Sequence, residues 1–187
     1  MGISIGEITR GMTILYEDEL YEVVEFEHVK RARGSAFVRA KLRALKSGRV
    51  TSVTLRDSDD IDAAYLETRP LQYLYSTGGS YVFMDKGNFE QYELARETVE
   101  SFAGYLLEGM DLAGLFYRGE LLKVQPPNFV DLRVAEAPPG VKGDTATGGE
   151  KPATLETGAT VKVPLFVKAG DVVRVDTRSG AYVERVG

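Results

Sequence analysis

Short runs of alternating apolar and polar residues dominate the chain and predict β-strands. The alternation is clearest over 35–45, where Phe37 and Val38 precede basic residues at every second position. Further strands are predicted at 20–26, 71–75, 80–84, 121–124, 130–134, 160–164, 172–176 and 181–183. The runs 71–75 and 80–84 flank a Ser-Thr-Gly-Gly turn, which indicates a hairpin. Many short strands separated by glycine and proline turns favour an all-β chain of small β-barrels in a row.

Helical signals are few. Apolar residues recur at three-to-four spacing over 97–110, which predicts one helix. Near the N-terminus, Ser4 and Glu7 have the spacing of a capping box, which predicts a single short helical turn.

The prolines divide the chain. All seven lie at or after Pro70, and Pro126 and Pro127 are consecutive. Two consecutive prolines cannot donate to a strand ladder, so they mark a break. We therefore predict three segments, 1–64, 65–127 and 128–187. Their basic and acidic residues number 10 and 11, 5 and 9, and 8 and 8, so their net charges are −1, −4 and 0.

Composition excludes several kinds of chemistry. The chain of 187 residues is 43% hydrophobic and 27% charged, as in ordinary globular proteins. It has no cysteine and one histidine, His28, so disulfides, thiolate catalysis and Cys- or His-pair metal sites are excluded. An enzyme would lack a nucleophile–base pair, so we expect none. No signal peptide or long apolar run is visible, so we expect a cytoplasmic location.

Charge is unevenly distributed despite a net charge of −5. No acidic residue interrupts the stretch from Val29 to Arg56, which holds nine basic residues: Lys30, Arg31, Arg33, Arg39, Lys41, Arg43, Lys46, Arg49 and Arg56. Strand-like sequence flanks a turn at Gly34, so Arg31 and Arg33 would lie at a hairpin tip, with Arg39, Lys41 and Arg43 on one face of its stem. Such a hairpin is either a solvated element with edge-protecting charges or a phosphate-binding tip.

Other candidate groups have simpler interpretations. The glycine-rich loop 143–152 lacks the Lys-Ser/Thr that a phosphate-binding loop needs after its second glycine. The aspartates Asp57, Asp59, Asp60 and Asp62 could bind magnesium, but a solvated turn is favoured. The aromatic residues Tyr73, Tyr75, Tyr81 and Phe83 could stack on bases, but a place in the core is favoured. His28 is interpreted as a structural or phosphate-side residue.

The ordered motifs of the chain resemble those of bacterial translation elongation factor P over its full length. The most specific stretch is Lys151-Pro152-Ala153 followed by Gly158, Val161, Val163-Pro164, Val167 and Gly170. Supporting stretches are 74–75, 83–84, 126–130, 139–145 and 175–180. The resemblance implies an N-terminal SH3-like (KOW) barrel and two OB-folds in an L-shaped, tRNA-like arrangement.

The resemblance also implies a function and its site residues. The family binds the ribosome between the P and E sites and relieves stalling at consecutive prolines. It implies that Arg33 is the tip residue, open to rhamnosylation by an arginine-modifying glycosyltransferase, and that Lys30, Arg31, Gly34, Arg39, Lys41 and Arg43 form the tRNA- and rRNA-binding hairpin. Gly143, Asp144 and Thr145 would face the E-site codon of the mRNA, and Tyr182 and Arg185 would face tRNA or the ribosome.

One departure and one alternative remain. Many members have Pro-Gly where this chain has Arg31-Ala32, which makes the turn more basic. The expected partners are the ribosome and peptidyl-tRNA, with no metal, other cofactor or membrane, and the expected state is a monomer. The alternative function is a single-stranded RNA-binding OB-fold protein that acts off the ribosome.

Overall fold

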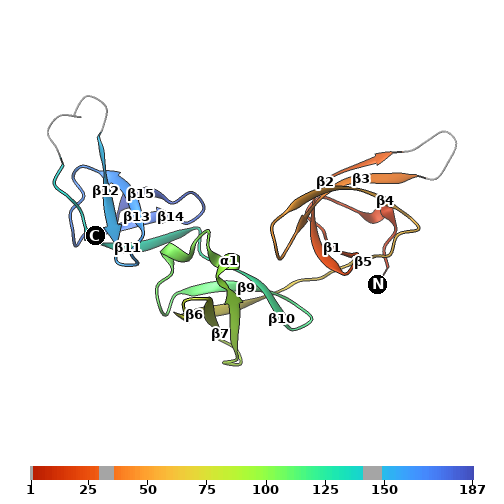
Figure 1. Ribbon diagram of the computed structural model, residues 1–187, viewed down its shortest axis with the longest axis horizontal. Coiled ribbons are helices and arrows are strands. Elements are labelled where there is room, and N and C mark those ends of the chain that lie inside the picture. Colours follow the sequence, from red (N-terminus) through yellow and green to blue (C-terminus); the bar gives the residue numbers. More distant parts are fainter. Residues whose placement is uncertain (1, 30–35, 141–148) are drawn as a thin grey trace. The chain divides into compact units, whose positions relative to one another are not determined.

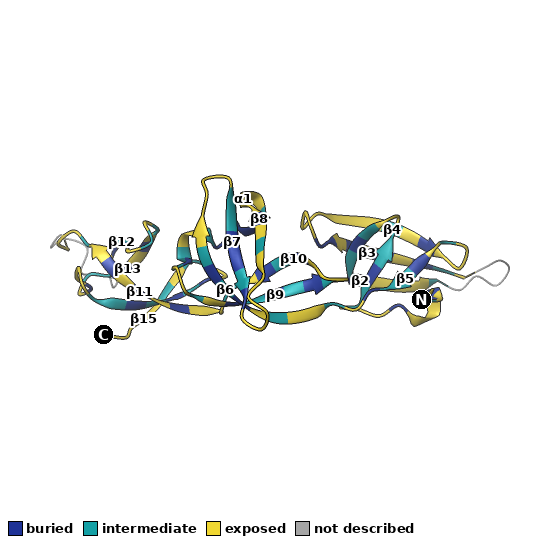
Figure 2. Cartoon of the chain, turned by 90° about the horizontal axis from the view of Figure 1, so that it is seen from below, coloured by how far each residue is buried: buried dark blue, intermediate teal, exposed yellow. Residues whose placement is uncertain are grey.

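Three five-stranded sheets form the structure, a computed structural model that describes residues 2–29, 36–140 and 149–187 (Figure 1). The predicted all-β class is confirmed. Buried and exposed residues alternate along many of the strands, so each sheet turns one face toward a core (Figure 2).

The first sheet has the order β4-β3-β2-β1-β5. Its strands are β1 (Thr13–Tyr16), β2 (Glu19–Val29), β3 (Phe37–Ala44), β4 (Val50–Arg56) and β5 (Ile61–Ala63). The core beneath it is aliphatic and includes Ile14, Val23 and Leu42, all with no exposed surface. The helical turn predicted from Ser4 and Glu7 is confirmed as a 3-10 turn, Ile5–Glu7, and the Ser4 amide donates to the Glu7 carboxylate at 2.8 Å.

The second sheet has the order β10-β9-β6-β7-β8. Its strands are β6 (Glu67–Ser76), β7 (Ser80–Asp85), β8 (Gln91–Ala95), β9 (Asp111–Tyr117) and β10 (Glu120–Gln125). The predicted hairpin over 71–84 is confirmed as β6–β7. Tyr73 and Phe83 are paired across it and buried, with ring centroids 5.7 Å apart. The core interpretation therefore holds for these two rings, whereas Tyr75 is exposed.

The third sheet has the order β13-β12-β11-β14-β15. Its strands are β11 (Phe129–Glu136), β12 (Glu150–Leu155), β13 (Thr160–Pro164), β14 (Val172–Asp176) and β15 (Ala181–Arg185). Its core is rich in valine, as expected for half-buried strands. The predicted C-terminal boundary of the loop 143–152 is wrong, because residues 150–152 belong to β12. Pro152 pairs with Lys162 of β13 and lies beyond the part of β12 that pairs with β11, where a missing N–H costs little.

The chain forms two compact units. One comprises Met1–Arg69 with Gly114–Lys123, and the other comprises Pro70–Ala113 with Val124–Gly187. In the first unit, Leu122 and Tyr117 pack with Leu20 and Leu45, which explains why the end of the β9–β10 hairpin belongs to it. The segment boundaries predicted from the prolines stay a prediction.

The predicted helix over 97–110 is wrong. Only α1 (Arg96–Val99) is α-helical, and a 3-10 turn (Ala103–Tyr105) follows. Amides here donate three residues back, as Phe102 does to Val99 and Tyr105 does to Phe102. Tyr105, Leu107 and Met110 pack on the core of the third sheet instead of forming one helix face. Glycines at 104 and 109 weaken a helix, and a Cβ at Gly104 would lie 3.2 Å from the Ala159 Cβ.

Candidate functional site

The β2–β3 hairpin carries the basic stretch identified in the sequence. Its strands pair from Tyr21–Ala44 to Val29–Phe37, with a bulge between Val23 and Glu25. On its far side β3 pairs with β4 along the whole stem, up to Phe37–Arg56. The pairing of β1 with β2 reaches only Glu22. The stem next to residues 30–35 is therefore a three-stranded ribbon of β2, β3 and β4.

One face of this ribbon, the outer face, presents the three predicted stem cations. Burial alternates strictly along β3, with Arg39, Lys41 and Arg43 exposed and Val38, Ala40 and Leu42 buried. The prediction that the three cations share one face is confirmed. Each cation stands in a row between a carboxylate on β2 and a residue on β4: Glu22–Arg43–Val50, Glu25–Lys41–Ser52 and Glu27–Arg39–Thr54.

Two of the three cations form ion pairs with β2. Lys41 Nζ lies 2.8 Å from Glu25 Oε2, and Arg43 Nη1 lies 3.3 Å from Glu22 Oε2. The hydrogen bond from Lys41 and its charge lower the pKa of Glu25. The acid-free stretch of sequence is therefore not an acid-free surface, because antiparallel pairing brings the glutamates of β2 alongside it. Sequence reasoning missed these glutamates, although Glu25 and Glu27 stand two residues apart, as one strand face requires.

Arg39 differs from the other two cations. Within the part of the chain that the structure describes, it forms no ion pair with a carboxylate. Its guanidinium carbon lies 5.8 Å from the centroid of the Phe37 ring. Arg39 is also the closest of the three to residues 30–35. It is therefore the stem cation whose donors are best placed to bind an anion.

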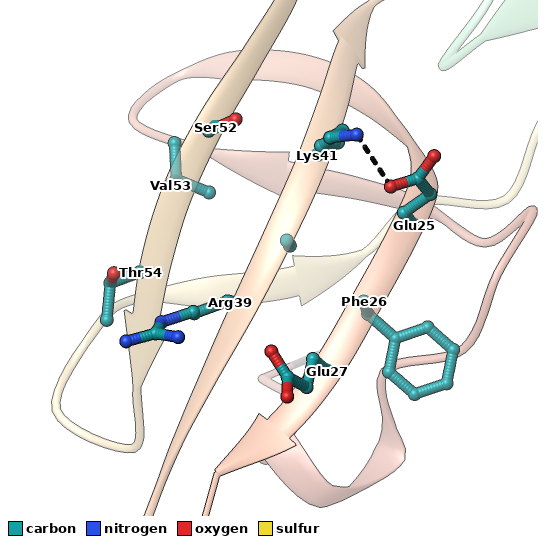
Figure 3. Close-up of a pocket in the computed structure, with 9 residues that line it drawn as sticks. Glu25, Phe26, Glu27, Arg39, Lys41, Ser52, Val53 and Thr54 are labelled. Carbon is teal, nitrogen blue, oxygen red and sulfur yellow. Dashed lines mark ion pairs between the residues drawn. The ribbon is translucent and has the colours of Figure 1, made fainter.

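A shallow groove of about 360 Å³ lies along this ribbon (Figure 3). Residues of all three strands line it: the outer-face residues Glu25, Glu27, Arg39, Lys41, Ser52 and Thr54, together with Phe26, Ala40 and Val53, which alternate onto the opposite face. Figure 3 shows the Lys41–Glu25 ion pair at one end and Arg39 beside Thr54 and Glu27 toward the other. The charged and hydroxyl side chains of the outer face can bind a ligand that carries both negative charge and hydrogen-bonding groups.

Two groups of predicted site residues lie outside the described residues. They are Lys30, Arg31, Arg33 and Gly34 at the predicted hairpin tip, and Gly143, Asp144 and Thr145 in the glycine-rich loop. His28, just before the first group, is exposed, and its ring lies edge-on to Phe26 with centroids 5.2 Å apart.

The remaining predicted contacts, Tyr182 and Arg185, lie on β15 in the second compact unit. Tyr182 is partly buried and packs against the core of the third sheet. Arg185 is more exposed, with its guanidinium carbon 5.5 Å from the Phe166 ring centroid and Nη1 3.6 Å from Asp171 Oδ2. Of the two, only Arg185 presents a charged group to solvent.

The acidic residues near Arg56 form a turn. The Asp57 carboxylate accepts the Ile5 amide at 3.2 Å, and the Asp59 carboxylate accepts the Arg56 amide at 2.8 Å. Among the described residues, no group of three or more His, Cys, Asp or Glu is placed to hold a metal ion. No helix within residues 2–29, 36–140 and 149–187 is long and apolar enough to cross a membrane.

Comparison with solved structures supports the fold. The structure is similar to eukaryotic translation initiation factor 5A from Methanococcus jannaschii, with a TM-score of 0.55 and 19% identity. The match covers 67% of this chain and 92% of that chain.

Family models account for nearly the whole chain. Residues 4–61 match the elongation factor P KOW-like domain, residues 66–124 its OB domain and residues 130–185 its C-terminal domain. The chain is 50% identical to elongation factor P of Natranaerobius thermophilus over 98% of both chains. It is 49% identical to that of Moorella thermoacetica over 98% of this chain and 99% of the relative. The predicted resemblance is confirmed: the chain belongs to the elongation factor P family, whose members are translation elongation factors.

Proposed function

We propose that this chain binds the ribosome between the P and E sites and stimulates peptide-bond formation at consecutive prolines by positioning the peptidyl-tRNA. Membership of the family over the full length supports a role in elongation and the ribosome as partner. The observation that carries the rest is the β2–β3 hairpin, whose braced stem leads directly into the basic residues 30–33.

The mechanism is positional rather than chemical. The ribosome joins the amino acids, and this chain holds one reactant in place. Holding reactants in the right geometry can contribute up to roughly 7–11 kcal/mol, and about 1.4 kcal/mol changes a rate tenfold. Proline is a poor acceptor of the growing peptide, so better positioning of the peptidyl-tRNA can speed its reaction. A small part of the roughly 7–11 kcal/mol is enough, because about 1.4 kcal/mol changes a rate tenfold.

The stem contributes through Arg39. Its guanidinium can donate a charge-assisted, bidentate pair of hydrogen bonds to a phosphate of the tRNA acceptor end. Lys41 and Arg43 contribute less, because each already pairs with a glutamate. Their ion pairs link β2 and β3 across the outer face.

The tip contributes through Lys30, Arg31, Gly34 and above all Arg33. Arg33 is the residue that reaches the CCA end of the peptidyl-tRNA and the acceptor for rhamnose from an arginine-modifying glycosyltransferase. An unmodified arginine stays charged at every physiological pH, so Arg33 can contact the RNA backbone through charge-assisted hydrogen bonds.

The C-terminal segment contributes contacts with the mRNA and with tRNA or the ribosome. We assign Gly143, Asp144 and Thr145 to the E-site codon, and Arg185 with Tyr182 to tRNA or ribosome. The three segments 1–64, 65–127 and 128–187 are the domains that we propose for this chain. Arg185 supports the assignment because its charged group is exposed beside Phe166.

The test is peptide synthesis on a reconstituted ribosome that reads three consecutive proline codons. Protein purified from its native host should accelerate synthesis on this message and leave a proline-free control message unchanged. The mass of the Arg33 peptide from the same sample reports the modification. A folded protein that binds naked RNA without accelerating synthesis would contradict the proposal and favour the free RNA-binding function.

A further inference from the structure

Phe89 occupies an unusual backbone conformation in the turn between β7 and β8. Its φ is 62°, and 70% of its surface is exposed. The other non-glycine residues with positive φ are Glu17, Asp18 and Arg118, among the residues described. Those three lie in two-residue hairpin turns, where positive φ is required. Phe89 lies instead in a five-residue connection, 86–90.

This turn is held firmly from several sides. The Phe89 amide donates to the Asp85 carbonyl at 2.8 Å, and the Asp85 amide donates to the Glu90 carbonyl at 2.9 Å. The buried Asp85 carboxylate accepts the Gly87 amide at 2.7 Å, and the Asn88 side chain bonds both the amide and the carboxylate of Glu90. The surrounding contacts therefore fix the backbone at Phe89, while most of the residue is exposed to solvent.

An aromatic side chain is the wrong choice here for stability. A residue that closes such a turn in the left-handed conformation is usually glycine or asparagine, because the Cβ of other residues meets the backbone. Bulky residues in this conformation are rare, and they gather at functional sites. Exposing the ring to water adds no stability either. Phe89 thus opposes the local rules of folding, as expected for a side chain retained for contact with a partner.

Charges around the ring indicate the kind of partner. Glu90 follows Phe89 directly, Glu93 is exposed on β8, and the segment 65–127 carries a net charge of −4. Lys86, the cation nearest to Phe89 in the sequence, is paired with Asp111 at 2.8 Å. Phosphates would be repelled by this surface. A protein pocket that is apolar inside and lined with Lys or Arg at its rim would complement both the ring and the carboxylates.

We propose that Phe89 inserts into an apolar, basic-rimmed pocket on a protein component of the ribosome. The inference rests on the ribosome binding in the proposed function, but not on the action at prolines. It assigns the β7–β8 turn to protein recognition, in contrast to the β2–β3 hairpin, which is assigned to RNA.

The first experiment compares stability and binding in one variant. Phe89→Asn keeps the turn and removes the ring. It should raise the midpoint of thermal unfolding by about 2–4 °C, because the strain is relieved. It should lower the affinity for purified 70S ribosomes at least about tenfold, as for an aromatic hot spot. Tyr65→Ala, which removes an aromatic residue that is 85% exposed elsewhere, should bind normally.

The second experiment identifies what the ring touches. A photoreactive benzoyl-phenylalanine at position 89 should crosslink to a ribosomal protein, and the same group at position 65 should not give that adduct. An adduct to ribosomal RNA, or unchanged affinity of Phe89→Asn, would overturn the inference. If Phe89→Asn binds weakly while the unaltered chain fails to accelerate proline codons, the proposed function fails and the Phe89 contact stands.

Discussion

The hydroxyl of Tyr105 occupies the space beside Gly180 that a side chain would need. A Cβ at Gly180 would lie 2.5 Å from the Tyr105 oxygen and 3.6 Å from the ring carbon that bears it. Gly180 has a φ of 69° and follows the turn after β14, where the buried Thr177 hydroxyl donates to the Pro127 carbonyl at 2.7 Å. Tyr105 thus packs the turn 176–180 against the segment 97–110, for which the sequence pattern had predicted a helix.

Gly180→Ala should lower the free energy of unfolding by about 2–4 kcal/mol, from the left-handed conformation and the clash together. The same change in a Tyr105→Phe background should cost clearly less, because removing the hydroxyl leaves the nearest ring atom at van der Waals distance. Denaturant unfolding of the four proteins in this double-mutant cycle measures the difference. Equal costs in both backgrounds would contradict the steric relationship.

Arg39→Ala should weaken ribosome binding about tenfold and reduce the slope of log affinity against log salt by about 1, because one phosphate contact is lost. The matched control is Glu25→Gln/Lys41→Met, which removes both charges of a neighbouring ion pair and leaves the net charge unchanged. Filter binding over a salt series gives both quantities. An equal loss in the control would mean that the three stem cations act alike.

Arg33→Ala should leave the thermal unfolding midpoint unchanged and abolish the acceleration at proline codons, because we assign this residue to the CCA end. Arg49→Ala is the control, since Arg49 belongs to the same basic stretch and is exposed at the other end of β3. The reconstituted proline assay measures both variants. Normal acceleration by the Arg33 variant would move the tip assignment to another residue.

Hydrogen bonds from the Arg178 side chain and amide hold the pKa of Asp176 at about 2, below its usual 3.8. A depressed folded-state pKa stabilises the fold above the unfolded value, and this stabilisation is lost as the pH falls from about 4 toward 2. Carboxyl NMR titration should find Asp176 near 2 in the unaltered chain and closer to 3.8 in Arg178→Ala. A titration midpoint that does not move would exclude Arg178 as the cause.

Strand patterning predicted the fold well where one face of a strand is buried. The alternation over 35–45 placed Arg39, Lys41 and Arg43 on the outer face because the period of a strand is two. It failed over 97–110, where turns and glycines interrupt the segment and Tyr105, Leu107 and Met110 pack on the core of the third sheet. Short strands such as β1 and β5 gave too few residues for any pattern to be seen.

The candidate site was predicted only in part, because charge neutralisation depends on strand register. The sequence alone does not show that Glu25 lies across from Lys41 and Glu22 across from Arg43. The bulge between Val23 and Glu25 shifts the strand pairing by one residue, and no sequence pattern predicts that shift. Phe89 gave no sequence signal at all. An aromatic residue in a glycine-containing turn is unremarkable until its φ and exposure are known.

The bulge between Val23 and Glu25 also limits how the hairpin can change length in evolution. Inserting one residue between Arg39 and Leu42 in β3 would turn Arg39 inward and Val38 outward. The two strands of the hairpin can therefore lengthen or shorten only by two residues at a time. The bulge already accommodates one odd residue on β2. Relatives whose β2 or β3 differs in length by an odd number of residues should therefore have lost this bulge or gained a second one. Relatives that keep the bulge should differ in strand length only by even numbers of residues.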